Sequence, residues 1–483
     1  MYEQLQTFSG LLNQIRLNHV DSVTAERLVR GAIDGMLASL DPHSYFLSRA
    51  DGQRMVDYRG RQLGGTGVTL DDLEDAVVVQ SVARRSPAER AGVQPGDRVL
   101  AVNDTVVYGL RSQTVQTRLL GPQGRRVRVR LERGSRFEPE TVSVQIRFEV
   151  LEQRSVLLAR RLAGGVGYVR LEEFGERAAE ELRRAAERVM EGNPRRLIVD
   201  LRGNPGGIVN QAVDIVSLFL PRGQLVFRTR GRRRESEQEY LTDRHGELQD
   251  VTLVVLIDER SASASEAVAG ALQDHDKALI MGRRSFGKAL MQRAFLVPPQ
   301  NDLVMLTVGW VELPSGRLIQ RPYRGMTSGQ YRSFAGEQAQ GDSTRVYRTR
   351  AGRAMQSGGG ITPDSLLATP AALPAWFTAA ADSGLLYTVT DSVAQSLAAD
   401  PATRDAWFND APRWQASLVQ PLLQRVRSRL GVAAQPDSAS AARIARIMAD
   451  RVVEVRWGPE AEEDFRLTHD MGVRAALRVL ARH

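Results

Sequence analysis

Apolar positions repeat with a helical period at both ends of the chain. The N-terminal stripe consists of Leu5, Phe8, Leu11, Leu12 and Ile15. It predicts one helix, and a second is expected over residues 25–36. Beyond about residue 366 helical stripes return, at Leu418, Leu422, Val426 and Leu430 and again at Ile444, Ile447 and Met448. We expect a mostly helical tail whose stripes pack on the core or on a second copy of the chain in a homodimer.

Residues 59–147 show a different pattern, in which short β-rich runs alternate with glycine and proline turns. The runs cover residues 76–82, 98–102, 126–131 and 142–148. A short helix is expected over 87–92, followed by a Pro-Gly-Asp turn into the next strand. This pattern predicts a small β-domain.

Between residues 148 and 365, strands and helices alternate. Apolar runs predict strands at 168–171, 196–201, 253–257, 279–281 and 304–310. Helices are expected at 177–190 and 265–273. The alternation indicates the α/β class, with a layered core. The chain thus divides into N-terminal helices (1–58), a β-domain (59–147), an α/β core (148–365) and a helical tail (366–483).

Composition narrows the class of protein. A length of 483 residues favours several domains, and no apolar run is long enough for an integral membrane segment. The absence of cysteine excludes disulfides, thiolate catalysis and cysteine-bound zinc. Residues 1–14 lack the features of a signal peptide.

The net charge of +8 does not by itself indicate a nucleic-acid partner. The densest basic run, residues 228–234, is followed at once by Glu235, Glu237 and Glu239, and it contains no aromatic residue. We expect a solvated, charged hairpin there and no nucleic acid.

Lysine is almost absent. The chain has only two, Lys277 and Lys288, among 65 basic residues. Arginine stays protonated in proteins, whereas a lysine of lowered pKa can act as a base. A lysine kept in this background hints at chemistry that arginine cannot perform, although either lysine can also be a chance survivor.

A serine cluster, Ser261-Ala-Ser-Ala-Ser-Glu266, follows a predicted buried strand and begins a helix of small residues. Side chains at such a junction lie at the carboxyl edge of the sheet, where α/β proteins place their sites. The helix N-terminus favours an oxyanion. The alternative is that these serines only cap the helix.

Two further segments follow neighbouring predicted strands. In Gly203-Asn-Pro-Gly-Gly207, adjacent glycines permit positive φ and a close backbone approach. Lys288 lies behind the strand at 279–281, and Gln292 could orient its amine if that stretch is helical. A tight turn and a surface lysine are the plainer alternatives. Together, the three segments suggest acyl transfer with a serine nucleophile and a desolvated lysine base.

Other chemistries fit less well. Gly282–Lys288 matches most of a phosphate-binding loop, but Ala289 stands where Mg²⁺ needs Ser or Thr. Ser285 and Lys288 match S-x-x-K, without the S-D-N and K-T-G partners of β-lactamases. None of the six histidines suits a Ser-His-Asp triad, and no H-E-x-x-H occurs. A zinc site is therefore unsupported.

Over roughly residues 35–365 the chain resembles the carboxyl-terminal processing peptidases, or tail-specific proteases, which are Ser–Lys serine proteases with a PDZ domain. The resemblance implies that Ser263 is the nucleophile, that Lys288, 25 residues later, is the general base, and that Gln292 is the third catalytic residue. It also implies that Gly206 or Gly207 joins the Ala264 N–H in the oxyanion hole, and that no metal and no organic cofactor is needed.

Residues 64–147 resemble the PDZ domain of that family, with Gly65, Thr66, Gly67 and Val68 as the carboxylate-binding loop. The resemblance implies a ClpP/crotonase-like protease core and an inserted PDZ domain that holds the free C-terminus of a protein or peptide substrate by strand addition. It implies cleavage near or from C-termini, and a periplasmic or cell-envelope location. Arg260 and Ala289 replace glycines of the family pattern. The competing hypothesis is a catalytically silent PDZ-bearing scaffold.

Overall fold

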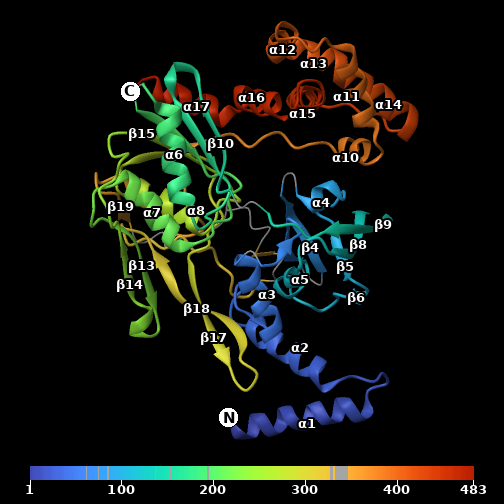
Figure 1. The fold of residues 1–483 in the computed structure, drawn as a ribbon, viewed down its shortest axis with the longest axis vertical. Coiled ribbons are helices and arrows are strands. Elements are labelled where there is room, and N and C mark those ends of the chain that lie inside the picture. The colour runs from blue at the N-terminus through green and yellow to red at the C-terminus, as the bar shows by residue number, and fades with distance from the viewer. Residues whose placement is uncertain are drawn as a thin grey trace.

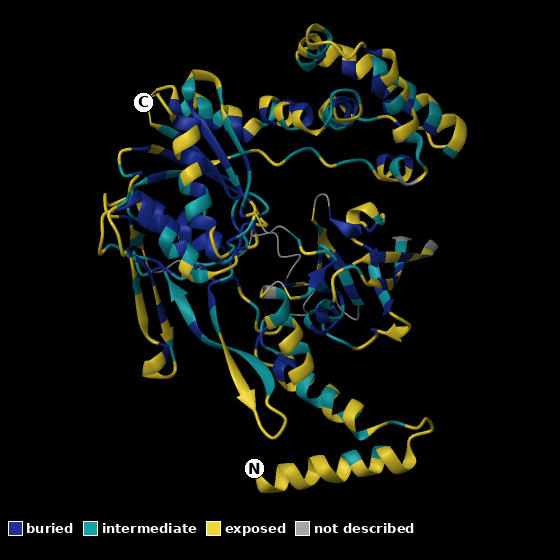
Figure 2. Cartoon of the chain, in the orientation of Figure 1, coloured by how far each residue is buried: buried dark blue, intermediate teal, exposed yellow. Residues whose placement is uncertain are grey.

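The computed structural model describes residues 1–60, 62–73, 76–83, 86–135, 138–151, 154–192, 195–326, 330–331 and 346–482. The chain begins with α1 (Tyr2–Asn18) and α2 (Ala25–Ala38), which confirms both N-terminal helices. No residue of α1 is buried, so its apolar stripe lies on the surface of this chain (Figure 2). β1 (Tyr45–Leu47) and α3 (Arg49–Arg59) follow.

The β-domain is an antiparallel sheet. Its order is β3 (Val68–Leu73), β4 (Ala76–Val82), β5 (Arg98–Val102), β8 (Arg126–Ser135) and β9 (Glu138–Arg147), with β6 (Thr105–Val106) beside β5. All four predicted runs are strands, and α4 (Pro87–Arg90) is the predicted short helix. The edge strand β3, the helix α5 (Ser112–Arg118) beside it, and the small β2–β7 pair (Gly64–Gly65 with Leu120–Gly121) were not predicted.

The α/β core confirms the predicted fold class. Its sheet has the order β10 (Val156–Arg161), β11 (Gly167–Leu171), β12 (Arg196–Asp200), β15 (Thr252–Ile257), β16 (Ala278–Gly282) and β21 (Ser365–Leu366). Only β10 runs antiparallel to its neighbour. The helices α6 (Ala178–Met190), α7 (Val209–Phe219) and α8 (Ala264–Asp274) pack on one face (Figure 1). Buried parallel strands read as unbroken apolar runs, which is why they were visible in the sequence.

A second sheet extends below the core in Figure 1. It joins β1, β18 (Asp302–Glu312), β13 (Leu225–Gly231) and β14 (Gln238–Leu241), and β17 (Leu290–Val297) also pairs with β18. The β13–β14 hairpin carries the basic run, with Arg228 3.7 Å from Glu239, which confirms the charged hairpin. Gln292 lies in β17, so the helix considered for that stretch is wrong: the segment pairs with β18 along its whole length.

The tail is helical, as predicted. Its helices are α10 (Ala375–Asp382), α11 (Leu385–Ser396), α12 (Pro401–Phe408), α13 (Ala411–Trp414), α14 (Gln420–Leu430), α15 (Ser438–Trp457), α16 (Pro459–His469) and α17 (Met471–Leu480), with a π-turn at Gln415–Val419 and a two-stranded β19–β20 ladder (Tyr347–Arg348, Ala354–Met355) before them. Within the tail, Leu418, Leu422 and Val426 are buried in its own core.

The last helix returns to the α/β core. Val473, Ala476 and Leu480 of α17 pack against Ile198 and Val254 on the face of the core sheet opposite α6 to α8. The tail thus supplies the second outer layer of the sheet. None of the helices in the described part of the chain combines the length and the hydropathy of a membrane span. The homodimer stays a prediction.

Candidate active site

Three segments meet at one edge of the core sheet. β12, β15 and β16 are parallel neighbours, so their carboxyl ends lie side by side. The Ala262 N–H donates to Asn204 O at 3.0 Å, which joins the glycine turn to the serine segment. The Phe286 N–H donates to Ser261 O at 2.9 Å, which joins the lysine segment to the same place. The edge of the sheet therefore brings together the three segments that the sequence singled out.

Ser263 differs from the two serines beside it. Ser261 donates to Leu201 O and Ser265 to Asn204 O, and both are fully buried. Ser263 is only half-buried and is the N-cap residue of α8, so the capping hypothesis describes its position correctly. Its backbone has φ 55° and ψ −112°, a conformation that a residue with a Cβ rarely adopts. Such strain is typical of functional positions, where surrounding structure imposes it.

Glu266 is a fully buried carboxylate that connects the serine and lysine segments. Its Oε1 accepts hydrogen bonds from Ser285 Oγ at 2.5 Å and from the Gly287 N–H at 2.6 Å. Its Oε2 accepts from the N–H groups of Ser263 at 2.9 Å and Lys288 at 2.8 Å. Burial raises the pKa of Glu266, and these four donors oppose that shift. In the sequence, Glu266 is only the last residue of the serine cluster, and no local signal indicates this role.

Lys288 lies in the extended segment between β16 and β17 and is half-buried. Burial lowers the pKa of its ammonium group, while the carboxylates of Glu266 and Asp41 raise it. A lysine in this setting can exist in the neutral form that a general base requires. The other lysine, Lys277, donates to the carbonyls of Gln249 and Val251, both at 2.7 Å, so it has a structural role.

The two glycines of the turn differ in their hydrogen bonds. The Gly206 N–H donates to Asn204 Oδ1 at 2.9 Å. The Gly207 N–H has no acceptor among the described residues. Gly206 has φ 101°, and a Cβ there would lie 2.9 Å from both Ser263 Cβ and Ala264 N. The turn therefore needs glycine at position 206 because its backbone touches the serine segment.

The segment from Asp41 to Ser44 reaches the site from the N-terminal region. The Gln292 Nε2 donates to His43 O, and the Gln292 Oε1 accepts no hydrogen bond from the described residues. The His43 ring nitrogen lies 2.9 Å from the Tyr331 hydroxyl. Sequence reasoning read this segment only as a helix break, because its proximity to Lys288 depends on tertiary structure.

The predicted PDZ loop lies at the start of the edge strand β3. The Gly65 N–H donates to Glu149 O, and the carbonyls of Thr66 and Gly67 accept from Ala88 and Ala83. The N–H groups of Thr66 and Gly67 have no acceptor among the described residues. Two free, adjacent N–H groups can bind a carboxylate.

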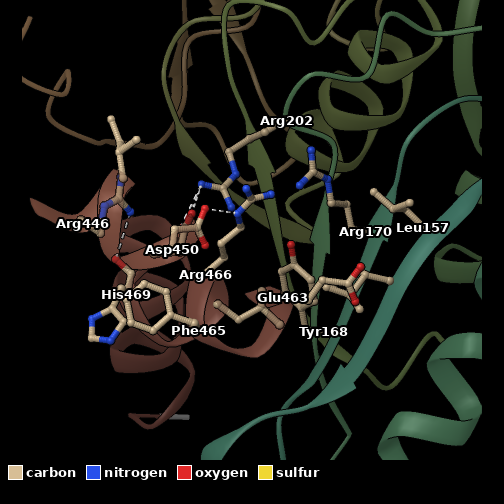
Figure 3. A pocket seen from close by; sticks show the side chains of 14 residues that line it. Leu157, Tyr168, Arg170, Arg202, Arg446, Asp450, Glu463, Phe465, Arg466 and His469 are labelled. Atoms are coloured by element: carbon tan, nitrogen blue, oxygen red, sulfur yellow. Dashed lines mark hydrogen bonds and ion pairs between the residues drawn. The ribbon is translucent and has the colours of Figure 1, made fainter. Parts of the chain in front are cut away.

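A cavity of about 220 Å³ lies elsewhere, between β10, β11 and the tail helices α15 and α16 (Figure 3). None of the predicted site residues lines it. At its margin Arg202 pairs with Asp200 at 2.5 Å and with Asp470 at 2.9 Å, so partly buried ion pairs hold this junction. In the described part of the chain, no group of acidic or histidine side chains is arranged to hold a metal ion.

Two parts of the chain match known protein families. Residues 165–328 match Peptidase family S41, and residues 78–133 match the PDZ domain. A carboxy-terminal-processing protease of Bartonella bacilliformis is 32% identical over 325 residues, covering 66% of this chain and 73% of the relative. A probable CtpA-like serine protease of Staphylococcus aureus is 30% identical over 302 residues, covering 59% of this chain and 60% of that protein.

A solved structure shares the fold. The photosystem II D1 C-terminal processing protease superposes with a TM-score of 0.51 at 24% identity, covering 75% of this chain and 87% of that chain. The match to Peptidase family S41 and the Bartonella relative confirm the family resemblance seen in the sequence. The chain belongs to the carboxy-terminal-processing proteases of Peptidase family S41.

Proposed function

We propose that this protein is a serine endopeptidase that cleaves protein substrates near or from their C-termini, with Ser263 as nucleophile and Lys288 as general base. The observation that carries the proposal is the single Glu266 oxygen that accepts from the N–H groups of both residues. It fixes the two segments against each other. The strained Ser263 backbone and the desolvated Lys288 amine support the same assignment.

The proposed reaction uses only groups of this chain and water. Neutral Lys288 takes the proton of the Ser263 hydroxyl while the Ser263 oxygen attacks the substrate carbonyl carbon. The N–H groups of Ala264 and Gly207 receive the developing oxyanion, since the Gly206 N–H is already bound to Asn204. Protonated Lys288 then donates its proton to the leaving amine. Water hydrolyses the acyl-enzyme by the same proton transfers, and both groups return to their starting state.

Gln292 has a supporting role in this proposal. Its Nε2 is anchored on the His43 carbonyl. We assign its Oε1 to the Lys288 amine, which it would orient by accepting a hydrogen bond. The residue thereby connects the N-terminal segment to the base.

The PDZ domain is proposed to recruit the substrate tail. A free C-terminal carboxylate would bind the N–H groups of Thr66 and Gly67, in the loop from Gly65 to Val68. The residues before it would add as a strand along β3, whose outer edge pairs with no strand in the described part of the chain. Both this recruitment and a location in the periplasm or cell envelope are inferred from the family resemblance.

The decisive test is the cleavage of an unstructured protein by the wild type, Ser263→Ala and Lys288→Arg. Both variants are expected to lose activity by at least about 1,000-fold. Ser263→Ala removes the proposed nucleophile, and Lys288→Arg introduces a side chain that cannot give up its proton. Lys277→Arg is the matched control and should cleave normally, since it changes the other lysine. If Lys288→Arg retains activity, Lys288 is not the base. If the wild type is inactive on all tails, the silent scaffold gains support.

Recruitment has its own test. A peptide with a free C-terminus and the same peptide with an amidated C-terminus are compared for binding to the Ser263→Ala protein. The free form should bind at least about tenfold more tightly, because only a carboxylate accepts strongly from the paired N–H groups. Equal binding would remove the carboxylate from the proposal.

A further inference from the structure

The outer edge of β3 is occupied by a side chain of the same domain. β3 pairs with β4 on one side, and α5 lies along its other side. The Gln116 Nε2 of α5 donates to Val68 O at 2.8 Å, and its Oε1 accepts from the Leu70 N–H at 3.0 Å. Both backbone groups belong to the strand that a substrate tail would pair with.

The Gln116 amide makes two of the bonds that a tail strand would make. In an antiparallel pair, each hydrogen-bonded residue exchanges both of its bonds with the one residue opposite it, so Val68 O and the Leu70 N–H would be bound by two tail residues that are two positions apart. The primary amide of Gln116 supplies one donor and one acceptor to these same two groups. A tail adding to β3 and the Gln116 side chain therefore compete for Val68 O and the Leu70 N–H.

Contacts with α2, α3 and β3 fix the position of α5, the helix that carries Gln116. Thr114 of α5 accepts from Arg30 of α2 at 2.8 Å, and Thr117 donates to Asp51 of α3 at 2.8 Å. The Ser112 N–H at the start of α5 donates to Asp72 Oδ1 of β3 at 2.6 Å. These contacts keep α5 against β3. A tail that binds to β3 therefore has to displace the Gln116 side chain, while the helix itself stays in place.

We propose that Gln116 is a specificity-determining residue that occupies the outer edge of β3 at rest, and that a substrate tail must displace its amide to add to β3. This inference rests on the proposed tail recruitment. It implies that a tail binds only if it forms hydrogen bonds to both Val68 O and the Leu70 N–H, which lose their bonds to Gln116. A proline at the tail position facing Val68 O has no N–H to donate, so such a tail cannot displace Gln116.

The experiment measures the binding of a labelled ten-residue peptide with a free, apolar C-terminus by fluorescence anisotropy. The full chain is used, with Ser263→Ala to prevent cleavage. Gln116→Met keeps the length of the side chain without its hydrogen bonds, and Gln116→Ala removes it. Gln145→Ala is the matched control, because Gln145 is an exposed glutamine of β9 at the far edge of the same sheet.

Both Gln116 variants should bind the peptide about three- to thirtyfold more tightly than the parent, because two ordinary hydrogen bonds no longer oppose binding. The control should change less than about twofold. Hydrogen exchange at the Leu70 amide gives a second readout: it should be faster in both variants when no peptide is present. Proline at the tail position that faces Val68 O should abolish binding to the parent.

Weaker or unchanged binding by both Gln116 variants would overturn the inference, and weaker binding would mean that Gln116 contacts the tail directly. If no variant binds a free C-terminus, tail recruitment fails and this inference fails with it. That outcome is distinguishable from a failure of the Ser263–Lys288 assignment, which is read on the cleavage of an unstructured protein.

Discussion

The backbone N–H groups of Ser263 and Lys288 donate to the same oxygen, Oε2 of Glu266, over 2.9 and 2.8 Å. The two residues follow different strands, β15 and β16, and are 25 positions apart. One acceptor shared by both segments fixes their separation more tightly than packing alone, because a shift of either segment costs a hydrogen bond to a buried carboxylate. Several consequences can be measured.

Glu266→Gln should reduce kcat by about 100-fold while the protein still folds. In glutamine an NH₂ group replaces one of the two carboxylate oxygens. Two of the four groups that donate to Glu266 would then face a donor instead of an acceptor. An unsatisfied buried donor costs about 1–3 kcal/mol of stability, and the displaced backbone misplaces Ser263 or Lys288. Kinetics and thermal unfolding check both effects. A variant that unfolds no earlier and cleaves at the wild-type rate would show that the shared acceptor is dispensable.

Asp41→Asn should shift the acidic limb of the kcat/KM profile to lower pH. Asp41 raises the pKa of Lys288, against the lowering effect of burial. Removing that charge lowers the lysine pKa further, so the neutral base persists to lower pH. Asparagine can still accept from the N–H groups of His43 and Ser44, as Asp41 Oδ1 does at 2.8 and 2.9 Å.

The control for this pH effect is Asp250→Asn. Asp250 raises the pKa of the other lysine, Lys277, which takes no part in the proposed reaction. Its removal should leave the pH profile of cleavage unchanged. A limb that moves to higher pH in Asp41→Asn would contradict Lys288 as the group that titrates there.

Gly206→Ala should reduce kcat by about 100-fold or more, with a smaller effect on KM. The residue has φ 101°, and the new Cβ would lie 2.8 Å from Ala262 O and 2.9 Å from Ser263 Cβ. It would push the nucleophile segment out of place. Gly223→Ala is the control, because Gly223 has φ 82° with nothing within 4 Å of the added Cβ. It should cost about 1 kcal/mol of stability and leave kcat unchanged.

The sequence predicted the parts of the fold that have a local signal. The buried strands β12 and β15 are apolar runs, and α6 and α15 have clear apolar stripes. The strand-end positions of Ser263, Gly206 and Lys288 followed from these elements, because the ends of parallel strands share one edge.

Tertiary contacts could not be predicted in that way. A helix was considered around Gln292, because a short run with one polar residue does not distinguish a helix from a strand. Pairing with β18 makes this segment a strand. Asp41 approaches Lys288 from about 250 positions away in sequence. Glu266 is acidic and follows a helix start, where an N-terminal Glu is ordinary, so nothing in the sequence distinguished its four-donor role.

Leu480→Ala should destabilise the protease core, although Leu480 lies in the tail that the sequence separated at residue 366. Leu480 is fully buried with Val473 and Ala476 against Ile198 and Val254 of the core sheet. Truncation of a buried leucine costs about 2–5 kcal/mol, so a clear fall in Tm is expected. Met471→Ala, at an exposed position of the same helix, is the control and should have little effect. If Leu480→Ala unfolds like the control, α17 does not stabilise the sheet and the tail folds as an independent unit; if it unfolds early and loses protease activity at the same temperature, the last helix is part of the protease core.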